Sequence, residues 1–283
     1  MTAVNPSVGE SFRRRLLGGV ASSLRRGCGL GTGRYARDVG NVYYQPGQAR
    51  SRRVEDLFAR IARRYDLLND LQSLGLHRGW KRRFVRMAEV KEGDRALDLC
   101  CGTGDIAKAL ADAGASVVGL DFSEPMLEVA RSRSAARGNS AAGRMAFCRG
   151  DAQSIPFPEA SFDVVTVAYG LRNLADWELG LEEMWRVLRP GGRLLVMDCG
   201  KPGNPIWRGL YYAYLKCWVP LLGRVVGGDA QAYSYILESL KYYAAQEGVT
   251  RKLSELGSPD VLEVNLMGGA MSLHRGRKGE GGR

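Results

Sequence analysis

Histidine is scarce in this sequence, and the cysteines form no metal-binding pairs. Among 283 residues the two histidines are His77 and His274, and the six cysteines include no Cys-x-x-Cys motif. Zinc sites need clustered ligands of these types, so no metal site is expected. Adjacent Cys100 and Cys101 are poorly placed to cross-link a core. We interpret all six cysteines as reduced thiols of an intracellular protein.

Long apolar runs are absent, and acidic residues are few near the start of the chain. No stretch of about 18 uncharged apolar residues occurs, so no membrane span is expected. Residues 1–53 contain ten arginines but only Glu10 and Asp38, and they carry +8 of the net charge of +11. Residues 275–283 carry the other +3, which leaves residues 54–274 neutral. A neutral folded part argues against a nucleic-acid-binding face, so no nucleic-acid partner is expected.

We expect a single domain, residues 54–278, followed by a short tail, 279–283. Apolar residues are 45% and charged residues 25% of the chain, as is typical of globular domains. The basic extension 1–53 is predicted to be disordered or a targeting segment, because its SFRRRLLGGVASSLRRGCGL stretch resembles an organelle transit peptide. The protein is therefore expected in the cytoplasm, at a membrane surface, or in an organelle if the extension directs it there.

From residue 54 onward, helix and strand patterns alternate along the chain. Apolar spacing predicts a helix beginning near residue 54 and a second one over 80–88. Expected strands occupy 95–102, 116–123, 145–152, 161–171 and 193–200, with one strand or a strand pair over 261–276. Expected helices lie between them, ending near 111 and spanning 125–138 and 179–192. This order predicts an α/β fold with a doubly wound, mostly parallel, seven-stranded Rossmann-like sheet.

The segment 201–260 interrupts this alternation and is expected to form a cap insertion. It contains the aromatic, apolar run IWRGLYYAYLKCWVPLLG and a further predicted helix over 233–249. The aromatic run is interpreted either as a buried cap helix or as an apolar entrance at a membrane surface, because aromatic rings suit such an interface. Its aromatic residues are Trp207, Tyr211, Tyr212, Tyr214 and Trp218. A homodimer through this cap is a further hypothesis.

A glycine-rich turn, Gly102-Thr103-Gly104, follows the first expected strand. Glycines there let backbone N–H groups approach a ligand at the start of a helix. Asp121 ends the second expected strand, where a carboxylate can accept hydrogen bonds from ribose hydroxyls. The spacing Gly102-x-Gly104-x-x-Ala107 also satisfies the dinucleotide fingerprint, so a nicotinamide-dependent dehydrogenase remains an alternative.

Four features favour S-adenosylmethionine over a dinucleotide. Asp98, before the turn, could hold the amine or water around a methionine group, although it could equally cap the turn. Asp105, at the start of the next helix, would repel a pyrophosphate. Asp151-Ala152 follows the third expected strand, where an acid could accept from the adenine amino group. The segment LRPGGRL, residues 188–194, forms a helix-turn-strand entry often found in methyltransferases.

Three longer motifs resemble a known family. YDLLNDLQSLGLHRGWK at 65–81 is similar to a block of the C-methyltransferases that make menaquinone and ubiquinone, and generic methyltransferases lack this block. GLRN at 170–173 and the ending GG…LHRGRK at 268–278 are similar to two further family motifs. In the cap, Tyr242-Tyr243-Ala244 stands where the family often has Phe-Pro, and Gly257-Ser258-Pro259 replaces its Gly-Phe.

The resemblance implies methyl transfer from S-adenosylmethionine to a ring carbon of a prenylated quinol. The product would be menaquinol made from demethylmenaquinol. The alternatives are a ubiquinone- or phylloquinone-pathway C-methyltransferase and a small-molecule O- or N-methyltransferase. By position, the resemblance implies that Thr103, Asp121, Asp151 and Ala152 contact the cofactor. With the turn residues, the candidate cofactor-binding set is Asp98, Gly102, Thr103, Gly104, Asp121, Asp151 and Ala152.

The candidate catalytic residues are Arg172, Asn173 and His77. A neutral ring carbon attacks a sulfonium poorly, and removing a proton from the adjacent hydroxyl raises its electron density. Arg172 could stabilise the phenolate directly or position a water that acts as the base, unless it pairs with Asp176. Asn173 could orient the ring oxygen. His77 is the alternative base, or else a helix-end residue that bonds a carbonyl.

Overall fold

The computed structural model describes residues 65–136, 141–222, 237, 239–240 and 243–281. The basic extension 1–53, the expected helix before residue 65 and part of the helix expected over 233–249 lie outside these residues. In the described part, no helix is long and apolar enough to cross a membrane.

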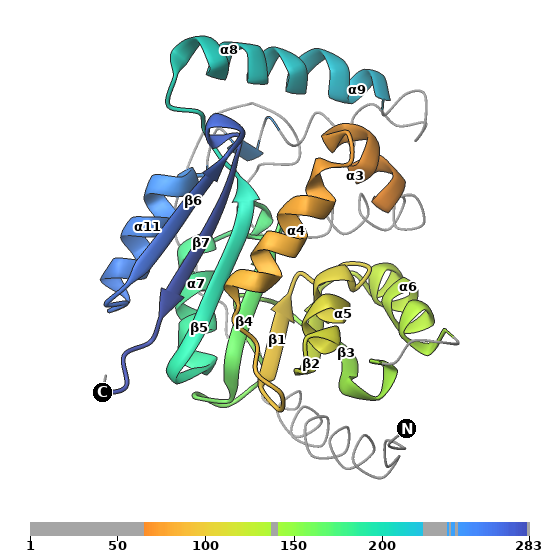
Figure 1. Ribbon diagram of the computed structural model, residues 1–283, viewed down its shortest axis with the longest axis vertical. Coiled ribbons are helices and arrows are strands. Elements are labelled where there is room, and N and C mark those ends of the chain that lie inside the picture. Colours follow the sequence, from red (N-terminus) through yellow and green to blue (C-terminus); the bar gives the residue numbers. More distant parts are fainter. Residues whose placement is uncertain (1–64, 137–140, 223–236, 238, 241–242, 282–283) are drawn as a thin grey trace.

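The sheet has seven strands in the order β3-β2-β1-β4-β5-β7-β6 (Figure 1). Their bounds are β1 Arg95–Leu99, β2 Ser116–Asp121, β3 Met145–Arg149, β4 Phe162–Ala168, β5 Leu188–Cys199, β6 Val261–Leu266 and β7 Met271–Arg277. The first five strands pair in parallel, and β7 pairs antiparallel with both β5 and β6. This confirms the predicted doubly wound, mostly parallel sheet, and the closing segment is a strand pair.

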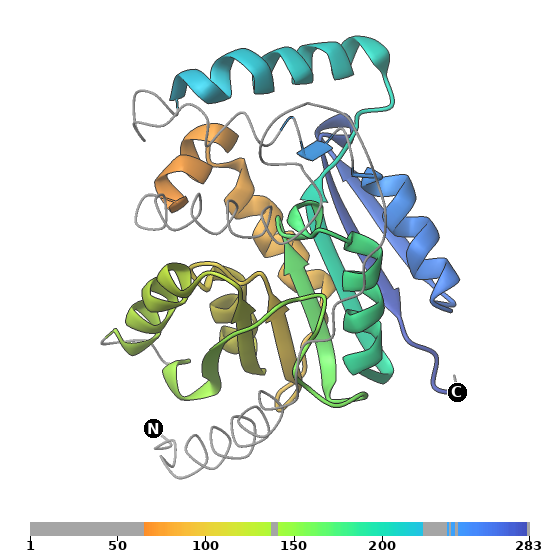
Figure 2. The ribbon, with the colours of Figure 1, turned by 180° about the vertical axis from the view of Figure 1, so that it is seen from behind.

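Helices cover both faces of the sheet and its upper end. Their bounds are α3 Tyr65–Ser73, α4 Leu76–Met87, α5 Asp105–Asp112, α6 Glu124–Ala135, α7 Trp177–Val187, α8 Pro205–Ala213, α9 Val219–Leu222 and α11 Ala245–Glu255. α4 and α5 lie on one face, and α7 and α11 lie on the other (Figures 1 and 2). α8 and α9 cross above the carboxyl ends of the parallel strands, next to α3. This arrangement leaves the carboxyl-end edge between the sheet and the upper helices for a ligand.

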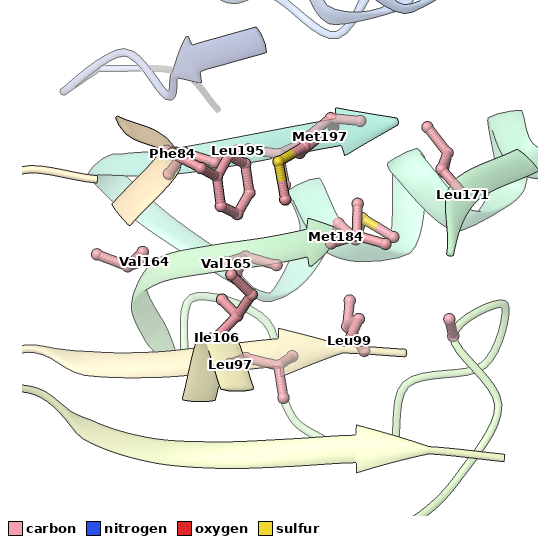
Figure 3. Packing of buried hydrophobic residues seen from close by; sticks show 14 of the residues in the cluster. Phe84, Leu97, Leu99, Ile106, Val164, Val165, Leu171, Met184, Leu195 and Met197 are labelled. Carbon is pink, nitrogen blue, oxygen red and sulfur yellow. The ribbon is translucent and has the colours of Figure 1, made fainter. Parts of the chain in front are cut away.

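The core lies where the central strands are sandwiched between the two helix layers. Leu97, Val165 and Leu195 are fully buried on β1, β4 and β5. Phe84 from α4 packs beside Leu195, and Met184 from α7 packs from the opposite face (Figure 3). Strands that are buried on both faces appear in sequence as nearly continuous apolar runs, which is why these strands were predictable.

Three helix boundaries differ from the prediction, each for a local reason. α4 begins at Leu76 rather than residue 80, because Gly75 adopts φ +77° and starts a new helix directly after α3. The helix expected to end at 192 stops at Val187, since Leu188 already pairs with Phe162 in the sheet. In the helix expected over 233–249, residues 243 and 244 are not helical, and α11 starts at Ala245. α11 packs on β6 and β7 rather than among the upper helices.

Candidate cofactor and substrate site

A pocket opens at the carboxyl ends of β1, β2, β3 and β4. The space between its walls, open mouth included, is about 860 Å³. Gly102, Asp121, Asp151 and Ala152 from the predicted cofactor set line it, together with the predicted Asn173. Asp98, Thr103, Gly104, Arg172 and His77 do not line it.

The glycine turn bends the chain sharply between β1 and α5. Gly102 and Gly104 adopt φ values of +53° and +85°, and Cys100 before them adopts +51°. The Gly104 N–H donates to the Cys101 carbonyl at 2.9 Å, which closes the turn immediately before α5 begins at Asp105. A Cβ on Gly104 would lie 3.2 Å from Ala130 and from Phe147, a tight contact, and the positive φ would strain any other residue there. The predicted role of the turn in close approach therefore has a geometric basis.

Asp121 is held in a fixed orientation at the end of β2. Its Oδ2 accepts from the Gly102 N–H and its Oδ1 from the Ser123 N–H, both at 2.8 Å. A carboxylate has about four lone-pair sites, so the same group can accept further hydrogen bonds. Asp121 thus links the turn to the next strand and presents an acceptor on the pocket wall.

Asp98 lies within the sheet, 1% exposed, at the carboxyl-terminal part of β1. Its Oδ1 accepts from the Thr166 hydroxyl at 2.7 Å, and its Oδ2 has no hydrogen-bond partner among the described residues. Burial raises the pKa of Asp98 to about 7, even though the Thr166 hydrogen bond lowers it. A buried, unsatisfied carboxyl oxygen is costly unless a donor approaches it. Asp98 therefore suits a cationic or N–H-bearing ligand group.

Asp151 and Ala152 form the third part of the pocket wall, after β3. The Asp151 Oδ1 accepts from the Gln153 N–H at 2.9 Å, and Ala152 is buried. Beside the glycine turn, Lys81 of α4 contacts Asp105, the first residue of α5, at 2.8 Å. Burial raises the pKa of Asp105, but the charges of Lys81 and Arg133 outweigh it and bring the pKa below its usual value. This ion pair fixes α4 against the glycine turn.

The turn after β4 carries Arg172, whose ion-pair partner is Asp198 and not Asp176. The Arg172 Nη1 contacts the Asp198 Oδ1 at 2.5 Å, and the Arg172 backbone N–H donates to the Asp198 Oδ2 at 3.0 Å. Both side chains are buried, at 6% and 0% exposed. Asp176 instead caps α7 by accepting from the N–H groups of Glu178 and Leu179. The pairing of Arg172 with Asp176 was therefore wrong.

Asp198 was not singled out from the sequence. The available signal was an acid near the end of an apolar strand, RLLVMDC, where a charged side chain must find a partner. Asp198 also accepts from the Cys199 N–H at 2.8 Å, so its carboxylate receives three hydrogen bonds from β5 and the β4 turn. It holds the Arg172 turn in place from beneath.

Asn173 reaches the pocket directly. Its Nδ2 donates to the Tyr169 carbonyl at 3.2 Å, which fixes the amide plane. Its Oδ1 is buried and has no hydrogen-bond partner among the described residues. The amide thus offers an acceptor where a ligand hydroxyl could supply the missing donor.

His77 lies in the first turn of α4, close to the end of α3. The Ser73 hydroxyl lies 2.6 Å from the Asn69 carbonyl and 2.8 Å from the His77 Nδ1. When the hydroxyl donates to the carbonyl, Nδ1 carries the ring proton and the lone pair is on Nε2. Burial and the charge of Lys81 lower the pKa of His77, which favours the neutral ring. The ring contacts a hydroxyl rather than the carbonyl expected of a helix-end residue.

No group of three or more His, Cys, Asp or Glu side chains within the described ranges could hold a metal ion. The sheet order, the glycine turn and the acid at the end of β2 define the Rossmann-like fold of S-adenosylmethionine-dependent methyltransferases. A putative S-adenosylmethionine-dependent methyltransferase from Methanococcus maripaludis shares it, with a TM-score of 0.56 at 19% identity over 80% of this chain and 95% of that one.

The family follows from the sequence matches. The model of the ubiE/COQ5 methyltransferase family matches residues 47–278, and the chain belongs to this family. It is 40% identical over 236 residues to the ubiquinone/menaquinone biosynthesis C-methyltransferase UbiE of Ectopseudomonas mendocina, covering 82% of this chain and 91% of that protein. The corresponding Pseudomonas putida F1 protein is 38% identical over 251 residues, 87% of this chain and 97% of that protein. The cofactor is S-adenosylmethionine, and the dehydrogenase alternative is wrong.

Proposed function

We propose that this protein methylates a ring carbon of a prenylated quinol, converting demethylmenaquinol to menaquinol. The observation that carries the proposal is Asn173, whose unpartnered Oδ1 lies on the cofactor pocket beside the buried Arg172–Asp198 pair. Its support from relatives is the name of the proteins to which the chain is about 40% identical. A ubiquinone- or phylloquinone-pathway ring is the alternative substrate.

The residues around the pocket fit the cofactor. S-adenosylmethionine, when bound, supplies an electrophilic methyl group on a sulfonium. Asp121 would accept from the ribose hydroxyls, and Asp151 and Ala152 would contact the adenine. Asp98 is buried and does not line the pocket itself, so it would hold the methionine amine through a water. Gly102, Thr103 and Gly104 form the turn that allows the close approach.

The quinol would be activated by its own hydroxyl. In the neutral quinol, Asn173 would accept from the hydroxyl next to the reacting carbon and hold the ring in line for attack. Transfer of that proton to the base would then raise the electron density of the carbon, and the charge of Arg172 would stabilise the phenolate. Once the carbon has taken the methyl group and S-adenosylhomocysteine has left, loss of the proton on that carbon restores the aromatic ring. Because Asp198 already pairs with it, Arg172 serves better as a fixed charge than as the group that positions a basic water. His77, neutral with its Nε2 lone pair available, is the better base.

A labelling assay tests the function. Reduced demethylmenaquinone and a reduced benzoquinone precursor are offered in parallel with methyl-labelled S-adenosylmethionine. Label in the naphthoquinol alone supports the menaquinone assignment, and label in both indicates an enzyme of two pathways. Cofactor binding without label in either substrate would refute the quinol assignment and favour a small-molecule O- or N-methyltransferase.

The role of His77 has its own test. His77→Ala should remove the low-pH limb of the rate profile and lower kcat, while Asn173→Ala should raise KM for the quinol. An unchanged pH–rate profile in His77→Ala would remove His77 as the base and leave a water held by Arg172.

We further propose that α8 and α9 contact a membrane surface. Large apolar side chains are exposed on these helices and on the segment Tyr214–Trp218 between them: Ile206, Trp207, Leu210, Trp218 and Leu221. Amphipathic aromatic surfaces of this kind lie well at the headgroup region, from which a prenyl tail could enter. Ile206→Ser/Leu210→Ser should reduce flotation with anionic liposomes without lowering the melting temperature. A homodimer through the same helices would instead appear as a concentration-dependent mass in light scattering.

A further inference from the structure

Tyr169 lies on the pocket wall in a backbone conformation that suits glycine better than tyrosine. It directly follows β4, lines the pocket and adopts φ +59°, in the left-handed region. A residue with a side chain is strained there, and glycine would adopt the same conformation without steric cost. The presence of a large aromatic residue at this point therefore needs an explanation beyond the shape of the turn.

Hydrogen bonds on both sides of the residue hold Tyr169 in this conformation. Its N–H donates to the Met197 carbonyl of β5 at 2.7 Å. Its own carbonyl accepts from the Arg172 Nη1 at 2.7 Å and from the Asn173 Nδ2 at 3.2 Å. Because the neighbouring strand and the following turn both fix its backbone, the place of Tyr169 on the pocket wall is determined by the fold.

This place lies between the cofactor residues and the residue assigned to the quinol. Gly170, next in the chain, packs against the turn after β1, since a Cβ there would lie 2.4 Å from the Cys100 Cβ. On the other side, the Asn173 amide bonds the Tyr169 carbonyl. Cys100, Tyr169 and Asn173 all line the same pocket. A methyl group that passes from the cofactor to a quinol beside Asn173 must cross this region, and before transfer a sulfonium cation carries it.

Among the described residues that line the pocket, two are aromatic, and they differ in their neighbours. Phe122 follows β2, and the Arg149 guanidinium lies over its ring, 5.4 Å from the ring centre. Phe122 therefore already faces a cation of the protein. Tyr169 packs against the core but is only half-buried, so part of it is open to the pocket. The face of an aromatic ring attracts cations, most strongly where water is excluded.

We propose that Tyr169 is a specificity-determining residue whose ring attracts the sulfonium of S-adenosylmethionine, so that the site prefers this cofactor to S-adenosylhomocysteine, whose sulfur is neutral. The inference deepens the proposed function, because it rests on the placement of the quinol beside Asn173. It explains a strained aromatic residue where glycine would suit the backbone. It also gives Tyr169 a role in turnover, since the product loses the attraction together with its charge and exchanges for fresh cofactor.

The test compares two ligands in wild type and in Tyr169→Leu. The dissociation constants of S-adenosylmethionine and S-adenosylhomocysteine are measured by calorimetry, without quinol. In Tyr169→Leu the affinity for S-adenosylmethionine should fall about threefold to thirtyfold relative to that for S-adenosylhomocysteine, the range for a contact between a cation and an aromatic face. Because both ligands are measured in the same protein, a general loss of folded protein cancels in the ratio.

Two further variants separate the charge of the ring face from its shape. Tyr169→Phe keeps the ring face and should keep the wild-type ratio of the two dissociation constants. A protein with trifluorophenylalanine in place of Tyr169 keeps the flat ring but has a less negative face. It should therefore lose the preference for S-adenosylmethionine as Tyr169→Leu does.

Phe122→Leu is the matched control. Because Arg149 already lies over this ring, the substitution should weaken the binding of both ligands by the same factor. Equal losses for the two ligands in Tyr169→Leu, or no loss for either, would overturn the inference and leave the ring as an uncharged part of the wall. If the ratio changes as expected but no quinol is methylated, the recognition of the sulfonium stands and the proposed function fails.

Discussion

Removing one partner of the Arg172–Asp198 pair should destabilise the protein strongly. Asp198→Leu fills a similar volume but leaves the guanidinium, 6% exposed, without its carboxylate. It also removes the acceptor for the N–H groups of Arg172 and Cys199. Stranding one charge of a buried pair typically costs about 3–5 kcal/mol. Since domains are stable by only about 5–15 kcal/mol, the variant should fold but unfold at much lower urea.

The double variant Arg172→Met/Asp198→Leu separates charge from packing. It removes the guanidinium together with its carboxylate partner, while still stranding two backbone N–H groups, so it should be about 2 kcal/mol more stable than Asp198→Leu alone. The assay is unfolding by urea. If the variants have the same m-value, differences between their unfolding midpoints measure differences in stability. A loss below about 1 kcal/mol in the single variant, or additive losses in the double variant, would refute the reasoning.

Three further predictions concern the pocket. Asp121→Ala should raise the dissociation constant for S-adenosylmethionine at least about tenfold in calorimetry, while an unchanged value would contradict its assigned role. Folding raises the pKa of Asp98 from 3.8 to about 7. As the pH rises between these values, the unfolding free energy of wild type should therefore fall relative to that of Asp98→Asn, by at most on the order of 4 kcal/mol. If the unfolding free energies of the two proteins, measured with urea in the absence of cofactor, change in parallel with pH, this shift is wrong. Gly170→Ala places a Cβ 2.4 Å from the Cys100 Cβ and should lower both the melting temperature and cofactor affinity, whereas Gly79→Ala in α4 meets nothing within 4 Å and should stabilise by about 0.5–1 kcal/mol.

The sheet was predictable because local patterns determine it. Strands buried on both faces are apolar throughout, and glycines mark their ends. The boundaries of α4 and α7 were harder to predict. The left-handed Gly75 and the pairing of Leu188 with Phe162 each override a continuous helical pattern. Such outcomes depend on contacts that helix periodicity does not contain.

The site residues also fall into a group that the sequence predicts and a group that it does not. Gly102 and Asp121 were predictable since a turn and a strand end identify them from neighbouring residues. Asp198 was not, because its importance lies in contacts between segments far apart in sequence. Arg172 and its carboxylate are separated by 26 residues. Spacing alone favours the nearer acid, Asp176, as the ion-pair partner of Arg172, but Asp176 instead caps α7.

The position of β7 between β5 and β6 has a consequence for how the protein is made. β6 pairs only with β7 in this sheet, yet the ribosome releases β6 first. Until β7 emerges, β6 has no partner and β5 exposes an unpaired edge, which is prone to mispairing. The final sheet can therefore assemble only after residues 271–277 have left the exit tunnel. A nascent chain stalled before this point should remain a substrate for chaperones, even though its cofactor-binding half is already complete.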